Sequence, residues 1–152
     1  MGNLDLLYNN LENQYETYQK LLVLQNNILV ALSSNNIVEL DKFLKEEQAF
    51  VLKVRSLEQQ RLKISNESCF ADLTLKEVIE KLDGEEKNKF ALMHDKIYAT
   101  LKQIKALNKN SKTIIESHLH SLSKLENNNQ PYSKDGAISI SKDLKYRYNN
   151  KV

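Results

Sequence analysis

The sequence predicts an all-α fold: an elongated antiparallel helical bundle or coiled coil with three long helices, one short helix and a flexible C-terminal tail. Two observations predict it. Residues 1–130 contain no proline, and their only glycines are Gly2 and Gly84, so few positions there break a helix. Leucine and isoleucine also return every three or four residues, which is the period of a helix with one apolar face.

Length and composition bound the fold further. The chain has 152 residues, of which 41% are hydrophobic and 28% charged, as expected for one helical domain. We expect a helical bundle over 1–126 and a flexible tail over 127–152. No stretch approaches the roughly 18 consecutive apolar residues of a membrane span, and the first residues lack the features of a signal peptide. The sequence therefore predicts a cytoplasmic location.

The first helix is predicted over residues 3–33. Its apolar seam alternates steps of four and three residues, which is typical of knobs-into-holes packing. The seam consists of Leu4, Leu7, Leu11, Tyr15, Tyr18, Leu22, Gln25, Leu29 and Leu32. Further apolar side chains widen this surface, so we expect the helix to contact more than one neighbour.

The second helix is predicted over residues 36–64. Asn36 followed by Glu39 has the form of a helix N-cap with an acidic partner three residues later. The break before it is short, so this helix should run antiparallel to the first. Glu46, Glu47 and Glu58 lie among basic residues, and we expect them to be solvated rather than catalytic.

A connector and a short helix follow. We expect the connector to place Phe70 and Leu73 against the bundle, and Cys69 to be a small packed hydrophobe. Thr74 and Glu77 repeat the capping pattern and begin a helix over residues 74–83. Gly84 then suits the left-handed conformation that follows a helix end.

The third long helix is predicted over residues 85–126. Its heptad seam consists of Phe90, Met93, Ile97, Leu101, Ile104, Asn108, Ser111, Ile115, His118, Leu122 and Leu125. Three of these positions, Asn108, Ser111 and His118, are polar. Polar seam residues weaken packing and help to fix register.

The sequence offers little for catalysis, metals or nucleic acid. His118 and His120 are two residues apart and point to different sides of a helix, so they are poor joint metal ligands. The scattered glycines form no phosphate-binding loop. The weakly basic tail lacks the concentrated basic surface that nucleic acid requires. We expect a non-enzymatic protein with no cofactor and no metal.

The remaining feature is an apolar stripe near the end of the third helix, made of Ile114, Ile115, Leu119, Leu122 and Leu125. It allows two interpretations. The stripe can accept an amphipathic helix from another protein. It can equally be core, packed on the first helix or on a second copy of the chain.

The chain resembles the FlgN family of flagellar export chaperones over essentially its full length. The residues that carry the resemblance are Glu47-Gln48, Val51-Leu52, Leu57-Glu58-Gln59-Gln60-Arg61, Leu107-Asn108, Ser111, Ile114-Ile115, Leu119, Tyr132 and Gly136. One departure is Ser111, where the family commonly has a second asparagine. Another is the chain end from Tyr146 to Asn150, which matches nothing in the family.

The resemblance implies a chaperone that keeps hook-filament junction proteins of the FlgK and FlgL types unassembled and delivers them to the export gate protein FlhA. It implies docking at the gate through Tyr132. The cargo-binding residues it implies, with anchors from the tail, are Leu107, Asn108, Ser111, Ile114, Ile115, Leu119, Leu122, Leu125, Ile138, Ile140 and Leu144. The alternative is a structural coiled-coil homodimer or scaffold without cargo, and weak homodimerisation of a chaperone also stays open.

Overall fold

The structure, a computed structural model, describes residues 2–128. It contains four helices, α1 (Asn3–Ser33), α2 (Ile37–Asn66), α3 (Leu75–Glu80) and α4 (Gly84–Asn128). These residues form no strand, so the prediction of an all-α fold is confirmed. The predicted division into a bundle over 1–126 and a flexible tail over 127–152 stays a prediction.

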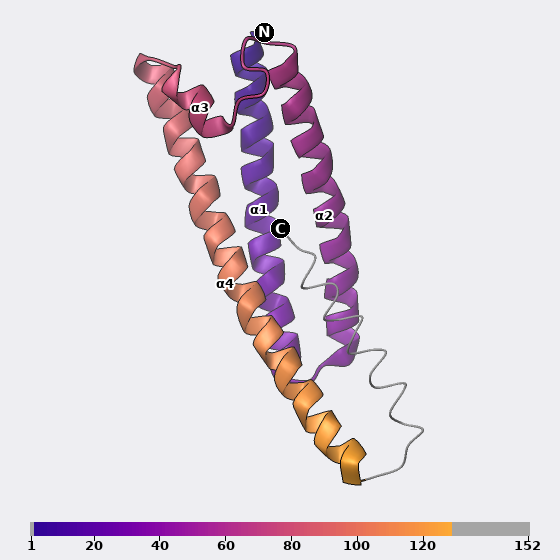
Figure 1. The fold of residues 1–152 in the computed structure, drawn as a ribbon. Coiled ribbons are helices and arrows are strands. Elements are labelled where there is room, and N and C mark those ends of the chain that lie inside the picture. Colours follow the sequence, from indigo (N-terminus) through magenta and orange to yellow (C-terminus); the bar gives the residue numbers. More distant parts are fainter. Residues whose placement is uncertain (1, 129–152) are drawn as a thin grey trace.

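The three long helices lie side by side, and α1 is the central one (Figure 1). α2 returns antiparallel to α1, and α4 runs alongside α1 in the same direction. α1 contacts both long neighbours, whereas no Cα atom of α2 comes within 8 Å of a Cα atom of α4 in the part of the chain that is described. The expectation that the first helix has more than one neighbour is confirmed.

The helix starts follow local capping chemistry. Asn36 accepts a hydrogen bond from the backbone N–H of Glu39 at 3.2 Å. Thr74 and Glu77 form a complete capping box, with bonds of 3.3 Å and 2.9 Å. Both predicted N-caps are confirmed. Gly84 has φ +62°, in the left-handed region that glycine adopts without strain, at the point where α4 begins.

Two apolar clusters hold the helices together. The first joins the beginning of α1 to α3 and the beginning of α4, and consists of Leu7, Leu11, Val78, Leu82, Phe90, Met93 and Ile97. The second joins α1 to the beginning of α2 and the middle of α4, and consists of Leu21, Leu24, Ile28, Ala31, Leu32, Leu40, Leu44, Ile104 and Ile115. Each cluster therefore stabilises a different level of the molecule.

The connector between α2 and α3 packs on the first cluster. Phe70 and Leu73 are partly buried there, as predicted. Cys69 is exposed, so its predicted role as a packed hydrophobe is wrong. Because Phe70 already covers the cluster from this turn, the adjacent cysteine faces solvent.

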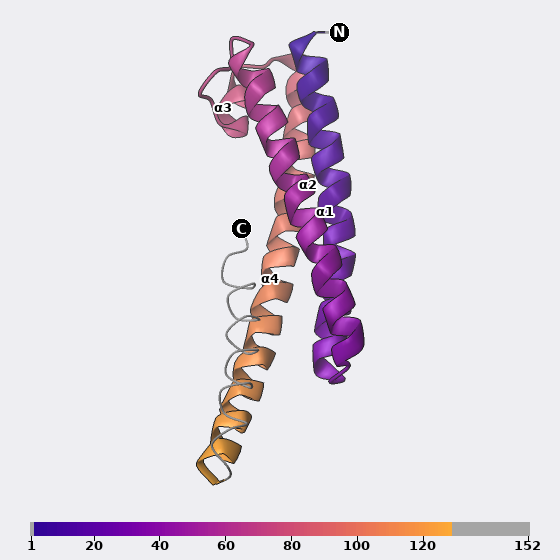
Figure 2. The same ribbon diagram turned by 90° about the vertical axis from the view of Figure 1, so that its right-hand side faces the viewer.

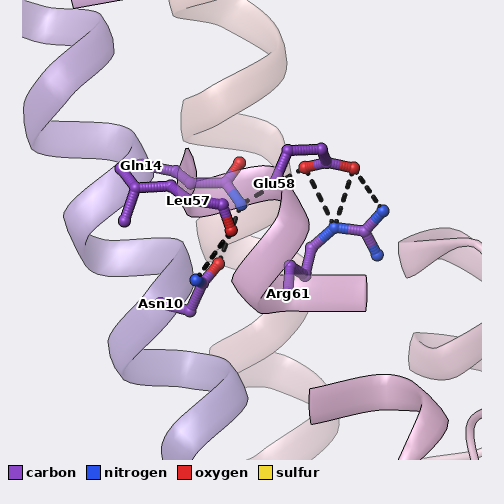
Figure 3. Close-up of polar contacts among 5 residues, drawn as sticks. All are labelled: Asn10, Gln14, Leu57, Glu58 and Arg61. Carbon is purple, nitrogen blue, oxygen red and sulfur yellow. Dashed lines mark hydrogen bonds and ion pairs between the residues drawn. The ribbon is translucent and has the colours of Figure 1, made fainter. Parts of the chain in front are cut away.

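Hydrogen bonds made by the side chains of Asn10 and Gln14 fix the register of α1 against α2 (Figure 3). Asn10 donates to the backbone oxygen of Leu57 at 2.9 Å, and Gln14 donates to the side-chain oxygen of Asn10 at 2.8 Å. Gln14 also donates to Glu58 at 3.4 Å, and Arg61 holds both oxygens of that carboxylate. Because Asn10 and Gln14 are buried, a shift in register leaves polar groups unpaired.

Candidate functional site

α4 is longer than its neighbours and extends beyond them. It has 45 residues against 31 in α1. Gln19 donates to the hydroxyl of Thr100 at 2.9 Å, and the same offset places Ser33, the end of α1, about level with residue 114. Toward this level α4 diverges from the α1–α2 hairpin, and it then continues beyond the end of the hairpin (Figure 2). We call residues 84–104 proximal α4 and residues 105–128 distal α4.

The cargo-binding residues expected on distal α4 fall into two groups. Ser111 and Ile115 are buried, and Ile115 belongs to the second cluster with leucines of α1 and α2. Ile114 and Leu119 are partly buried and pack on the same cluster. The stripe is therefore partly core in this conformation, as one of its two interpretations requires. Leu107 and Asn108 are half-buried beside it.

The end of the stripe is accessible. Leu122 and Leu125 expose 37% and 57% of their surface. His118, which was predicted to lie in the seam, is exposed as well. The seam ends here because α1 has already ended, so no other helix among the described residues covers this part of α4.

Several polar side chains are buried at the level where distal α4 begins. The offset set by Gln19 and Thr100 places Gln25 within one turn of Asn108. Gln25 Oε1, Asn108 Oδ1 and Ser111 Oγ have no hydrogen-bond partner among the described residues. Each unpaired buried polar atom costs about 1–3 kcal/mol. Distal α4 is therefore held less firmly than proximal α4.

Glu47 is a third residue, after Cys69 and His118, whose place differs from the expectation from the sequence. It is buried with 2% of its surface exposed and accepts a hydrogen bond from Gln25, whereas the sequence led us to expect a solvated side chain. Its spacing held a signal: Leu40, Leu44 and Glu47 follow the four-and-three pattern of a buried seam. Glu46 and Glu58 are exposed and half-exposed respectively.

The rest of the expected site lies outside the described residues. This applies to the docking residue Tyr132 and to the tail anchors Ile138, Ile140 and Leu144. In the part of the chain that the structure describes, no helix is long and apolar enough to cross a membrane. Within the same residues, no group of three histidine, cysteine or acidic side chains is placed to hold a metal ion.

The model of the FlgN protein family matches residues 1–138. The chain belongs to the FlgN family. This membership supports a general role as a flagellar export chaperone. The FlgN match covers all four helices and continues past Tyr132 to Ile138. No curated protein and no solved structure matches the chain.

Proposed function

We propose that this FlgN-family chain binds the terminal helix of hook-filament junction proteins of the FlgK and FlgL types on distal α4. Binding keeps these proteins unassembled in the cytoplasm until the chaperone delivers them to the export gate protein FlhA. The physical basis is simple. Proteins that polymerise through terminal helices stay apart when one such helix is covered.

One observation carries the proposal: distal α4 continues beyond the end of α1 with Leu122 and Leu125 exposed. An amphipathic helix that lies along this surface removes both side chains from water. It also extends the cover over Ile114 and Leu119, which are only partly buried against the cluster. Burial of one leucine contributes about 1.5–3 kcal/mol, so a few such residues support a stable complex.

The proposal assigns two further roles to residues beyond α4. Ile138, Ile140 and Leu144 act as apolar anchors that close over bound cargo, at the entropic cost of ordering a segment. Tyr132 docks at FlhA, because tyrosine combines a large contact area with few rotatable bonds. The support for both roles is the family resemblance. A Tyr132→Ala variant should bind cargo normally and lose affinity for FlhA in a pull-down assay.

The test of the cargo surface uses a C-terminal fragment of a FlgK-type or FlgL-type protein and light scattering. The wild-type chain should form a one-to-one complex with the fragment. Leu125→Asp should weaken this complex by at least about tenfold, because it puts a charge into the apolar contact. Leu92→Asp is the matched control: Leu92 lies on proximal α4 and is 58% exposed, against 57% for Leu125.

The same measurements examine the alternative, a coiled-coil homodimer or scaffold. An exposed apolar helix end also suits pairing with a second copy. A scaffold should give a self-associated species that the fragment does not change, and Leu125→Asp should convert it to monomer. That pair of results would reject the chaperone proposal.

A further inference from the structure

Distal α4 carries a row of lysines along one side of its apolar surface. Lys105, Lys109 and Lys112 are separated by four and three residues, so they lie on the same side of the helix. Lys112 is seven residues before Leu119, which places the row in line with the apolar surface. Lys105 and Lys109 are exposed, and Lys112 is half-buried. A partner helix that lies along α4 from Leu119 back to Lys105 therefore meets these charges.

The opposite side of the same surface carries no charged residue from Asn110 to Ser121, and Lys124, three residues after Ser121, is the first charge on it. Asn110, Ser117 and Ser121 follow one another at seven and four residues, and all three are exposed. Between residues 105 and 121 the lysine side contains one acidic residue, Glu116, four residues after Lys112, and Glu126 follows on this side seven residues after Leu119. Over residues 105–121 the apolar surface is therefore bordered asymmetrically, by net positive charge on one side and by uncharged polar groups on the other.

The stability of the helix does not explain this row. None of its three lysines forms an ion pair within the described residues, whereas Asp41 and Lys45 on α2 pair at 3.0 Å. Like charges four residues apart, such as Lys105 and Lys109, destabilise a helix slightly. The helix dipole favours lysine only in the last turn, and Lys112 lies about four turns before the end of α4.

We infer that the occupant of distal α4 is an amphipathic helix of another protein, with acidic side chains bordering its apolar face where it meets Lys105, Lys109 and Lys112. This inference rests on the proposed function and specifies its partner. Two other occupants are disfavoured by charge. The segment after residue 128 has more basic than acidic residues, and antiparallel pairing with the distal α4 of a second copy brings two lysine rows together.

Two synthetic helical peptides test the inference. Both carry the same leucine face, which is bordered by glutamate in one peptide and by lysine in the other. At about 50 mM salt the full chain should bind the glutamate peptide roughly tenfold more tightly, and the difference should shrink at about 500 mM as screening increases. Isothermal titration calorimetry measures both affinities.

Variants without these lysines test whether the lysine row causes the preference for the glutamate peptide. The triple variant Lys105→Gln, Lys109→Gln and Lys112→Gln should lose the preference for the glutamate peptide. The matched control is Lys42→Gln, Lys53→Gln and Lys87→Gln, which removes the same charge from exposed positions elsewhere and should keep the preference. Equal affinity for both peptides, or a preference that survives in the first triple variant, would overturn the inference.

The junction-protein fragment separates this inference from the proposed function. If the fragment binds the wild type and the row variant equally well, the proposed function stands and the acidic border is wrong. If the fragment does not bind while the glutamate peptide does, the surface chemistry stands and the proposed partner is wrong.

Discussion

Proximal and distal α4 belong to one continuous helix with one apolar seam, yet they differ in how much of that seam is buried against neighbouring helices. Proximal α4 has a neighbour along its whole length and buries Phe90, Met93 and Ile97 in the first cluster. Distal α4 buries Ser111 and Ile115, and then exposes Leu122 and Leu125. The difference shows that an apolar seam becomes core only where a neighbouring helix is long enough to cover it.

The hydrogen bonding of the buried polar groups also differs between proximal and distal α4. In proximal α4 the buried hydroxyl of Thr100 accepts a hydrogen bond from Gln19. In distal α4 the buried hydroxyl of Ser111 and the amide oxygen of Asn108 have no partner among the described residues. The buried hydroxyl of proximal α4 is thus paired, whereas distal α4 has exposed leucines and unpaired polar atoms within the described residues.

Truncation of one apolar side chain in each part should give the largest contrast. Phe90 is 2% exposed and packs edge-on against Tyr8, with ring centroids 5.4 Å apart. Phe90→Ala should lower the free energy of unfolding by about 3–5 kcal/mol. Leu125→Ala should change it by less than about 0.5 kcal/mol, because the side chain already contacts water. Urea denaturation measures both, and similar losses would remove the distinction between the two parts.

The sequence predicted the features that depend only on residues near one another in the chain. The N-caps at Asn36 and Thr74 were predictable because the cap and its partner lie three residues apart. The polar interruption at Asn108 and Ser111 was equally visible in the heptad pattern. Such features do not depend on which helix lies beside them.

The remaining features depend on tertiary contacts that no local pattern contains. Sequence periodicity placed His118 in the seam, because it does not show that α1 ends about level with residue 114. It also did not identify the partner that allows Glu47 to be buried, because Gln25 lies on a different helix. For the candidate site, the pattern identified the stripe but not which part of it the chain itself covers.

Removal of a hydroxyl group from each part should have effects of opposite sign. Thr100→Val keeps the shape of the side chain and removes the acceptor for Gln19, so it should lower the free energy of unfolding by about 1 kcal/mol. Ser111→Ala removes an unpaired buried hydroxyl and should raise it by about 1 kcal/mol. Thermal or urea unfolding of both variants measures the difference. A loss of stability in Ser111→Ala would mean that this hydroxyl is paired.

The smallest effect is expected at the junction between the two clusters, where Tyr18 of α1 packs against both. Burial raises the pKa of Tyr18 above its ordinary value of 10.0, the carboxylate of Glu58 raises it further, and Arg61 opposes the shift. The folded chain therefore keeps this proton at a pH where the unfolded chain has lost it. The stabilisation is fully present below about pH 10 and is lost as the pH rises further.

Tyr18→Phe removes this dependence, because phenylalanine does not ionise. Between about pH 9 and about pH 11 the free energy of unfolding should fall more steeply for the wild type than for Tyr18→Phe. Tyr98→Phe is the control, since Tyr98 is 63% exposed and should leave the wild-type slope unchanged. Equal slopes for wild type and Tyr18→Phe would mean that the junction tolerates a tyrosinate. In that case the two clusters would be joined less tightly at Tyr18 than its burial indicates.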